Sequence, residues 1–486
     1  MNYLEVLRAA APETVLTITV LMVLAVDLIV LRGESVARRF ATGAMVSILG
    51  CLVAAVFTFT HYGYADPLHG LLIVDPLTNF LKLVLLGLTV FTVLISASGK
   101  FTEHVGEYLA MVLLATIGLM FLVSAENLLM IFISLELASL SLYILTAFNK
   151  RNARSSEAAL KYFLFGGMSA AFLLFGLSLL YGLSGSTNLP QIAANLAGKG
   201  MDPLLLVAIV TTVIGFGFKV AAVPFHLWAP DAYEGAPTPG AAFIASGSKV
   251  ASFYILAKIL ALGFAGAAGS AAWHGYVSGW TPVIAVVAAL SMVLGNLTAI
   301  VQSSVKRLLA YSAIAHAGYM LLGVLANTPT SLSALLFYVI TYALTVLGAF
   351  GVVAVVEEAT GGDALVNFAG LSRRAPGLSL CLLVFLLSLG GIPPLAGFIG
   401  KFLVFSAAAG ADANHLGLLW LVILAIVMSA VSFYYYLQVL KQAYVLDPPE
   451  GASAIKVPLV MMLTLILLAV LVVLLGCVPG LLLRFI

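Results

Sequence analysis

The stretch from Gly215 to Lys249, GFGFKVAAVPFHLWAPDAYEGAPTPGAAFIASGSK, joins two very apolar segments and carries residues that could move protons. Lys219 and Lys249 are its lysines, and Pro224 and His226 stand between them. A lysine at the centre of a membrane span costs about 2.5–3.5 kcal/mol even on a lenient insertion scale. Two such lysines beside a helix-breaking proline therefore indicate conduction of protons or other ions.

A carboxylate provides a partner for these lysines. Glu136 lies at the centre of the apolar segment NLLMIFISLELASLSLYILTAF. In lipid it must be protonated or paired with a cation, and Lys219 is the natural partner because it too lies inside an apolar span. Such a pair can exchange a proton when a neighbouring charge changes. The alternative is that Glu136 only holds two helices together through a polar contact.

A second broken segment, 377–408, places glycines and prolines before Lys401, namely Gly390, Gly391, Pro393, Pro394 and Gly397. A proline removes an intrahelical hydrogen bond and clashes with the preceding turn. In lipid the freed carbonyls must be satisfied by protein or water, so both breaks are expected in the bundle interior or along a cavity. For Lys401 the alternative to a functional role is structural pairing.

The remaining buried lysines differ in how deep they lie. Lys249 has small or apolar neighbours on both sides, whereas a lysine that extends to the membrane surface lies near the end of its span. Lys258, Lys82 and Lys161 lie nearer span ends, and for each of them extension to the surface explains the position as well as function does. Lys306 begins a span, where a basic residue also anchors the helix.

His226 and His316 are the histidines in apolar surroundings. A neutral imidazole can both donate and accept a proton, which suits a relay between lysines. A packed and hydrogen-bonded histidine explains each position nearly as well. Haem ligation would need paired axial ligands on facing helices, and two isolated histidines support it only weakly.

Composition places these residues in a polytopic helical membrane protein. Hydrophobic residues make up 63% of the chain and charged residues 9%, whereas soluble domains are about 25% charged. The mean hydropathy is +1.15. The net charge of +2 does not suggest a nucleic-acid partner. No CxxC motif, P-loop or strand-linked GxGxxG is present, so iron–sulfur, zinc and nucleotide sites are not indicated.

A membrane-spanning helix needs about 20 mostly apolar residues, and the sequence predicts about fourteen of them. No basic region with a cleavage site precedes the first, so we expect it to be retained. The limits are 11–31, 41–61, 76–98, 108–124, 127–148, 157–181, 203–222, 239–263, 281–301, 307–326, 331–356, 377–408, 415–440 and 457–482.

Loop charges predict the orientation, because cytoplasmic loops collect lysine and arginine. The opposite side holds only Arg8, Lys199 and Arg484. We therefore expect both termini to face away from the cytoplasm. Most loop cations follow odd-numbered spans: Arg32, Arg38, Arg39, Lys100, Lys150, Arg151, Arg154, Lys306, Arg307, Arg373, Arg374, Lys441 and Lys456.

The two broken segments are separated by an odd number of spans and so cross the membrane in opposite directions. This is the layout of an inverted repeat whose discontinuous helices form an ion path near the midplane. The prediction is an all-α polytopic membrane protein with two inverted five-helix repeats, each containing a broken helix. The repeats are helices 4–8 (108–264) and helices 9–13 (277–445), with helices 1–3 (1–107) before them and helix 14 (456–486) after them.

Three stretches carry a resemblance that covers nearly the whole chain: FKVAAVPFHLWAPDAYEGAPTP, SVKRLLAYSAIAHAGYM and FAGLSRRAPGLSLCLLVFLLSLGGIPPLAGFIGKF. With them the chain resembles the antiporter-like membrane subunits of respiratory complex I. Among these it is most similar to the bacterial N type, the counterpart of mitochondrial subunit 2. Two features distinguish it from the other types. The M type is expected to carry glutamate where this chain has Lys401. The L type shares the lysine but has a long C-terminal lateral helix, whereas this chain stops shortly after its last predicted span.

The resemblance implies two proton half-channels driven by quinone reduction in other subunits. Glu136 and Lys219 would form the input-side ion pair, Lys249 the central link and Lys401 the output-side site. His226, Lys161, His316 and Lys306 would be candidate relay members. FMN, iron–sulfur clusters and quinone are expected in partner subunits, with no cofactor or metal in this chain.

The implied partners are neighbouring antiporter-like and small membrane subunits and, through them, the peripheral redox arm. The implied location is the bacterial inner membrane. Two other functions stay open from the sequence. One is a subunit of a multi-subunit monovalent cation/proton antiporter, which shares the fold and the lysine pattern. The other is a membrane scaffold, which the cost of buried charges argues against.

Overall fold

The computed structural model describes residues 3–60, 66, 70–97, 99, 101–198, 200–411 and 416–486. These residues form helices and isolated bridges, with no β-strand among them. In this described part, 12 helices are long and apolar enough to cross a membrane, and three apolar helices are shorter. The prediction of an all-α polytopic membrane protein is confirmed. Lys100 and Lys199, used for the predicted orientation, lie outside the described residues.

Two compact units divide the chain. Unit 1 comprises Met1–Phe216, Gly235–Gly266 and Phe485. Its helices are α1 (Tyr3–Ala9), α2 (Ala11–Ala25) with the π-helix η1 (Val26–Val30), α3 (Val36–Thr60), α4 (Pro76–Ser96), α5 (Val105–Ser124), α6 (Leu128–Thr146), α7 (Ala153–Ser184), α8 (Leu189–Leu196), most of α9 (Pro203–Lys219), α11 (Thr238–Ala245) and α12 (Gly247–Lys258) with η2 (Ile259–Gly263).

Unit 2 comprises Gly217–Glu234, Ala267–Arg484 and Ile486. Its helices are α10 (Trp228–Gly235), α13 (Trp280–Ile300), α14 (Val305–Ala326), α15 (Pro329–Thr360), the short α16 (Leu371–Arg374), α17 (Pro376–Gly390), α18 (Ala396–Gly410), α19 (Leu419–Tyr444), α20 (Leu459–Cys477) and α21 (Gly480–Leu483). One predicted span, 377–408, is thus two helices, α17 and α18, and both predicted helix breaks are confirmed.

Local sequence sets several of these helix ends. Asp75 begins α4 with a capping box, because its side chain accepts the Thr78 N–H while the Thr78 hydroxyl accepts the Asp75 N–H. Asn127 caps α6 by accepting the Leu129 N–H at 3.0 Å. The short turn that separates predicted spans 108–124 and 127–148 is therefore a genuine helix boundary.

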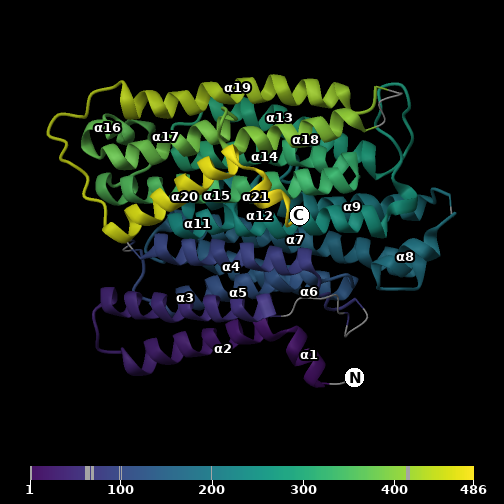
Figure 1. The fold of residues 1–486 in the computed structure, drawn as a ribbon, viewed down its shortest axis with the longest axis horizontal. Coiled ribbons are helices and arrows are strands. Elements are labelled where there is room, and N and C mark those ends of the chain that lie inside the picture. The colour runs from purple at the N-terminus through teal and green to yellow at the C-terminus, as the bar shows by residue number, and fades with distance from the viewer. Residues whose placement is uncertain are drawn as a thin grey trace. The chain divides into compact units, whose positions relative to one another are not determined.

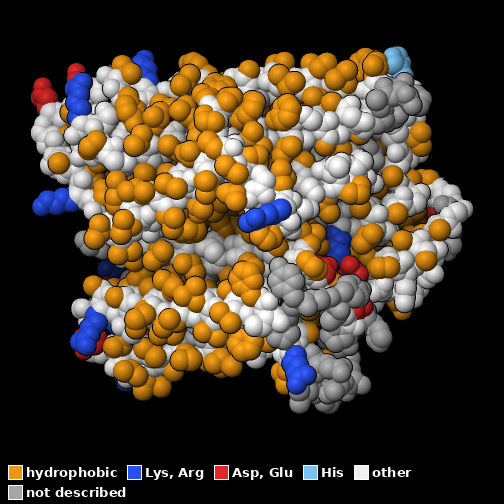
Figure 2. All heavy atoms as spheres, viewed as in Figure 1, with side chains coloured by type: hydrophobic (Ala, Val, Ile, Leu, Met, Phe, Trp, Pro, Cys, Tyr) orange, Lys and Arg blue, Asp and Glu red, His pale blue; other side chains and the backbone are white. Residues whose placement is uncertain are grey.

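Within unit 1, α5 packs against α2, α3, α4, α6 and α12, so it is the most enclosed of the N-terminal helices. Within unit 2, α14 and α15 are almost entirely buried and are surrounded by α13, α17, α18, α19 and α20 (Figure 1). Hydrophobic side chains cover most of the visible face, and charged side chains on it are sparse (Figure 2). Buried charges must therefore be sought along the enclosed helices.

Candidate functional site

The first helix break begins at Lys219, the last residue of α9, and ends where α10 begins at Trp228. Ala221 takes a left-handed conformation with φ of 58°. In this turn the Ala222 N–H donates to the Gly217 carbonyl at 2.8 Å, and the Ala221 N–H donates to the Phe218 carbonyl at 3.0 Å. These bonds satisfy the carbonyls that the end of the helix releases, as lipid requires.

Side chains complete this first break. The Trp228 indole donates to the Phe218 carbonyl at 3.0 Å. The Val223 N–H donates to the Ser291 hydroxyl of α13 at 2.9 Å. Lys219 is only 8% exposed, and its ammonium lies 5.4 Å from the centroid of the Phe218 ring. His226 lies in the same non-helical segment and is half-buried.

The second break, between α17 and α18, is closed by a lysine. The Lys401 ammonium donates to the carbonyls of Leu389 and Gly390, both at 3.0 Å, and to the Ser429 hydroxyl at 2.8 Å. It also lies 5.2 Å from the centroid of the Tyr319 ring. Lys401 is 4% exposed, so a buried ammonium satisfies the carbonyls at the end of α17.

Two glycines make this second arrangement possible. Gly391 has φ of 87°, and a Cβ there would lie 3.3 Å from the Lys401 ammonium nitrogen. At Gly397 a Cβ would lie 1.9 Å from the Ser388 carbonyl oxygen, so only glycine lets α18 approach α17 this closely. A cavity of about 460 Å³ lies beside Lys401, lined mainly by apolar side chains such as Phe402 and Phe433.

A buried polar network surrounds His316 in α14. Its Nδ1 is hydrogen-bonded to the Tyr338 hydroxyl at 2.7 Å, and its Nε2 to the Tyr436 hydroxyl at 3.1 Å. The Tyr436 hydroxyl also bonds Ser312. All four side chains are 1% exposed. Imidazole and hydroxyl groups both donate and accept, so this set can pass a proton.

The network extends toward Lys401. The Asn296 amide donates to the Tyr319 hydroxyl at 2.8 Å and accepts from the Tyr435 hydroxyl at 3.0 Å. The Tyr435 ring packs against Tyr436 at 4.5 Å between centroids. Because Lys401 lies over the Tyr319 ring, hydrogen bonds and ring contacts together connect Lys401 to His316 within unit 2.

Lys306 and Arg307, at the start of α14, are both tied to acids. The Lys306 ammonium contacts Glu357 at 2.8 Å. Arg307 contacts Asp231 at 2.8 Å and Glu234 at 2.9 Å. These contacts join the start of α14 to the end of α15 and to α10, which supports the anchoring role beside the predicted relay role.

The predicted residues of unit 1 lie in different surroundings. Lys249, in the first turn of α12, is 1% exposed. Lys258, at the end of the same helix, contacts Glu126 at 2.9 Å. Lys161 contacts Glu157 at 2.8 Å on the exposed side of α7. Glu136 is half-buried in α6. It belongs to unit 1 and Lys219 to unit 2, so their pairing stays a prediction.

Sequence reasoning missed several buried polar residues. Glu13 of α2 and Lys82 of α4 form an ion pair at 2.7 Å in which each side chain is 1% exposed. The sequence places Lys82 near a span end, where extension to the surface and function explain it equally well, and it does not single out Glu13. At 1% exposure Lys82 does not extend to the surface. Asn296 and the tyrosines were missed because isolated polar groups inside an apolar helix resemble ordinary core residues. One available signal was the pair Tyr435-Tyr436 beside a further tyrosine, Tyr434.

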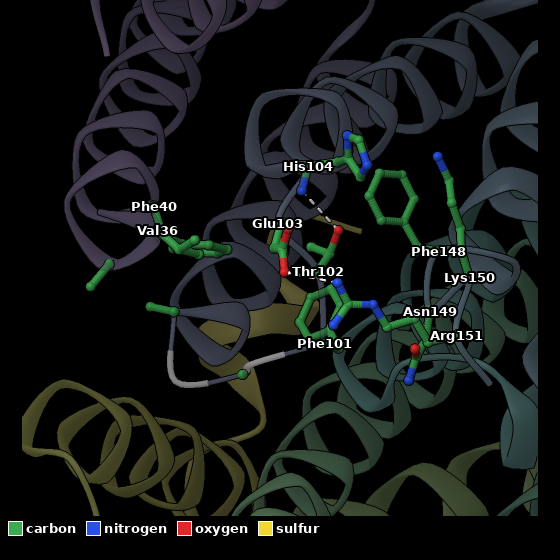
Figure 3. Close-up of a pocket in the computed structure, with 13 residues that line it drawn as sticks. Val36, Phe40, Phe101, Thr102, Glu103, His104, Phe148, Asn149, Lys150 and Arg151 are labelled. Atoms are coloured by element: carbon green, nitrogen blue, oxygen red, sulfur yellow. Dashed lines mark hydrogen bonds and ion pairs between the residues drawn. The ribbon is translucent and has the colours of Figure 1, made fainter. Parts of the chain in front are cut away.

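Another cavity, of about 670 Å³, lies elsewhere in unit 1 (Figure 3). Apolar residues such as Phe101 and Phe148 line it, together with an exposed ion pair between Arg151 and Glu103 at 3.1 Å. None of the predicted site residues is among its lining residues. Within the described ranges, no three His, Cys, Asp or Glu side chains are grouped so that they could hold a metal ion.

Known proteins resemble this chain in sequence and in fold. The family model described as NADH:quinone oxidoreductase/Mrp antiporter, TM, matches residues 125–431. The NADH-quinone oxidoreductase subunit N 2 of Acidobacterium capsulatum is 55% identical over 495 residues, covering 100% of this chain and 99% of the relative.

Solved structures agree with the sequence comparison. A chain of respiratory complex I from Thermus thermophilus with bound aureothin superposes with a TM-score of 0.79 at 35% identity, covering 97% of this chain and 98% of that one. A chain of the Mrp complex from Dietzia sp. DQ12-45-1b has a TM-score of 0.81 at 20% identity, covering 99% and 96%, which shows the shared fold alone. This chain therefore belongs to the NADH:quinone oxidoreductase/Mrp antiporter family of membrane proteins, among the N-type subunits of NADH-quinone oxidoreductase.

Proposed function

We propose that this chain is a proton-translocating membrane subunit of NADH-quinone oxidoreductase. It couples quinone reduction in other subunits to proton transfer through its own buried Glu, Lys and His residues. The observation that carries the proposal is the Lys401 site, where a buried ammonium closes a helix break and faces a buried polar path. An intramembrane ionisable residue in such a position marks a proton or ion pathway.

The residues divide into sites and relays. Glu136 and Lys219 form the input-side pair, Lys249 the central link, and Lys401 the output-side site. His316 is a relay member, supported by its bonds to two tyrosine hydroxyls. The further relay members are His226, Lys161 and Lys306.

Electrostatic repulsion supplies the coupling. Two charges roughly 5–10 Å apart at an effective dielectric constant near 20 interact by about 2–3 kcal/mol. Moving one charge against 100 mV costs about 2.3 kcal/mol. A proton arriving at one buried site can therefore drive the proton of the next site onward against a membrane potential of this size.

The proposal includes the assembly around the chain. FMN, iron–sulfur clusters and quinone belong to partner subunits, and neighbouring antiporter-like and small membrane subunits link this chain to the redox arm. The chain lies in the bacterial inner membrane with both termini on the non-cytoplasmic side. The helix 4–8 and helix 9–13 repeats form the two half-channels.

The test is proton pumping by the assembled complex carrying Glu136→Gln, Lys219→Ala or Lys401→Ala. Each variant is expected to lower protons moved per electron or the coupled quinone reductase rate by about tenfold or more. Assembly is checked by subunit composition and cofactor absorbance. Wild-type pumping by all three assembled variants would disprove the proposal.

A cation/proton antiporter subunit is the second candidate, because the matching family model covers both classes. Co-purification separates them. Peripheral subunits with flavin and iron–sulfur absorbance support the redox complex. Sodium-dependent proton flux from a complex that lacks such subunits would support the antiporter.

A further inference from the structure

A buried ion pair joins two helices that precede the predicted repeats. Glu13, in the first turn of α2, meets Lys82 of α4 with 2.7 Å between Oε1 and Nζ, and each side chain is 1% exposed. No hydrogen-bond donor among the described residues reaches the Glu13 carboxylate besides the Lys82 ammonium. The charge of this carboxylate therefore depends on a single partner.

Stability alone does not explain this pair. Replacing a buried ion pair by apolar side chains of similar volume is often neutral or stabilising, whereas removing one partner is strongly destabilising. Apolar residues at positions 13 and 82 can therefore also hold α2 against α4. A pair of opposite charges adds the ability to hold and exchange a proton.

The helix that carries Lys82 packs against the helix that carries Lys249. The helix of Lys82, α4, packs against α11 and α12. The start of α4 and the end of α12 are at the same end of unit 1. Backbone hydrogen bonds hold the loop before α4 against the turn after α5, since the Ile73 N–H donates to the Ser124 carbonyl and the Glu126 N–H to the Gly70 carbonyl, both at 2.8 Å. Glu126 in turn contacts Lys258 at the end of α12.

Charged groups line this end of unit 1. Glu126 holds Lys258 at the end of α12, and the Lys258 ammonium lies 5.7 Å from the Tyr254 ring centroid. At 1.5 Å per residue, Lys82 lies roughly 10 Å inward from Asp75, and Lys249 roughly 13 Å inward from Lys258. Lys82 and Lys249 thus lie at similar depth on contacting helices.

We infer that Glu13 and Lys82 form a further proton-transfer site, which continues the line of buried charges from Lys249 toward the N-terminal helices. The inference rests on the proposed function. Transfer of one proton from Lys82 Nζ to Glu13 Oε1 breaks an N–H bond, forms an O–H bond and leaves a neutral amine and a carboxylic acid. A proton delivered to the amine and one released from the acid restore the ion pair.

Proton pumping by the complete complex in proteoliposomes tests this site. The principal variant is the double substitution Glu13→Leu/Lys82→Met, which leaves neither an unpaired buried charge nor an unpaired buried amide. It should assemble with wild-type thermal stability, and protons moved per electron should fall roughly two- to tenfold. Wild-type pumping by this assembled double variant would overturn the inference.

A second variant covers failure of the double variant to assemble. Lys82→Arg keeps a cation beside Glu13, but arginine does not release its proton in proteins. The assembled Lys82→Arg complex should also pump roughly two- to tenfold less per electron. Full pumping by it would equally overturn the inference.

The matched control is a second ion pair of unit 1, in which the acid is buried and the arginine is half-buried. Arg39 makes two bonds to Asp27, at 2.6 and 2.7 Å, and Asp27 is 2% exposed. The neutral pair Asp27→Asn/Arg39→Gln should leave pumping unchanged, and an equal loss there would overturn the inference. Lys249→Met is measured in parallel. If Lys249→Met lowers pumping while the Glu13/Lys82 variants pump fully, this inference alone is wrong. If Lys249→Met and the Glu13/Lys82 variants all pump fully, the proposed function is wrong as well.

Discussion

The two helix breaks of unit 2 satisfy their freed backbone carbonyls with different side chains. At the first, between α9 and α10, the Trp228 indole donates to the Phe218 carbonyl, next to Lys219. At the second, between α17 and α18, the Lys401 ammonium itself donates to the carbonyls of Leu389 and Gly390. Both leave a buried lysine at the break, and at the second break the lysine itself caps the backbone.

This difference distinguishes a lysine's role in supporting the backbone from its role in proton transfer. At the second break one ammonium satisfies the backbone and stands at the end of a polar path, so its removal should affect both stability and pumping. At the first break the carbonyl is satisfied by an uncharged indole, so stability and pumping should be separable. The following variants test that distinction, from the largest expected effect to the smallest.

Lys401→Met should have the largest effect because it removes the donor from two buried carbonyls. A buried polar group that loses its partner costs about 1–3 kcal/mol. The apparent melting temperature of the purified complex should therefore fall, together with pumping. Lys219→Met should lower pumping while the melting temperature falls less. Equal melting temperatures for the two variants would remove the contrast between the breaks.

Trp228→Phe tests the first break directly. It leaves the Phe218 carbonyl without the indole donor, with an expected cost of about 1–2 kcal/mol because the Ala221 N–H still reaches that carbonyl. The melting temperature should fall while protons per electron stay close to wild type. A pumping loss as large as that of Lys219→Met would mean that the indole and the lysine act together.

Tyr436→Phe tests the polar path. It removes the hydroxyl that joins His316 to Ser312 without changing the ring that packs on Tyr435. Pumping should fall roughly two- to tenfold with little change in assembly. Tyr434→Phe is the control, since Tyr434 is 56% exposed, and it should pump as wild type does. Equal pumping by both variants would place the proton path elsewhere.

Two further variants change the backbone at each break, and Ala221→Gly is expected to have the smallest effect of all. Ala221 has φ of 58°, where an L-residue pays about 1 kcal/mol and glycine does not, so Ala221→Gly should be neutral or slightly stabilising. Gly391→Ala, at φ of 87° and close to Lys401, should destabilise by about 1–3 kcal/mol. Thermal scans of both variants measure these changes, and a stabilising Gly391→Ala would contradict the geometry.

The sequence predicts the fold and the breaks well because their causes are local. Apolar runs define the spans, and Gly390, Gly391, Pro393 and Pro394 mark the end of α17. The same reasoning places Lys219 and Lys401 beside the breaks. It does not show what caps each break, because Trp228 and Lys401 reach their carbonyls only once the chain has folded.

The missed residues have a physical reason too. Glu13 lies in the first turn of its helix, where an acid is expected for its interaction with the helix dipole and not as a buried partner. Its pairing with Lys82 is non-local, across α2 and α4. Asn296 and Tyr435 are likewise joined only by the packing of α13 on α19.

Lys401→Arg tests the central claim most directly, that the lysine closing the second break also carries the translocated proton. Arginine can donate to the Leu389 and Gly390 carbonyls but remains protonated, so it can replace the structural role alone. The neighbouring cavity of about 460 Å³ gives its longer side chain room. The prediction is an assembled complex with near-wild-type melting temperature whose proton-pumping rate falls about tenfold. A wild-type pumping rate in that complex would contradict the account.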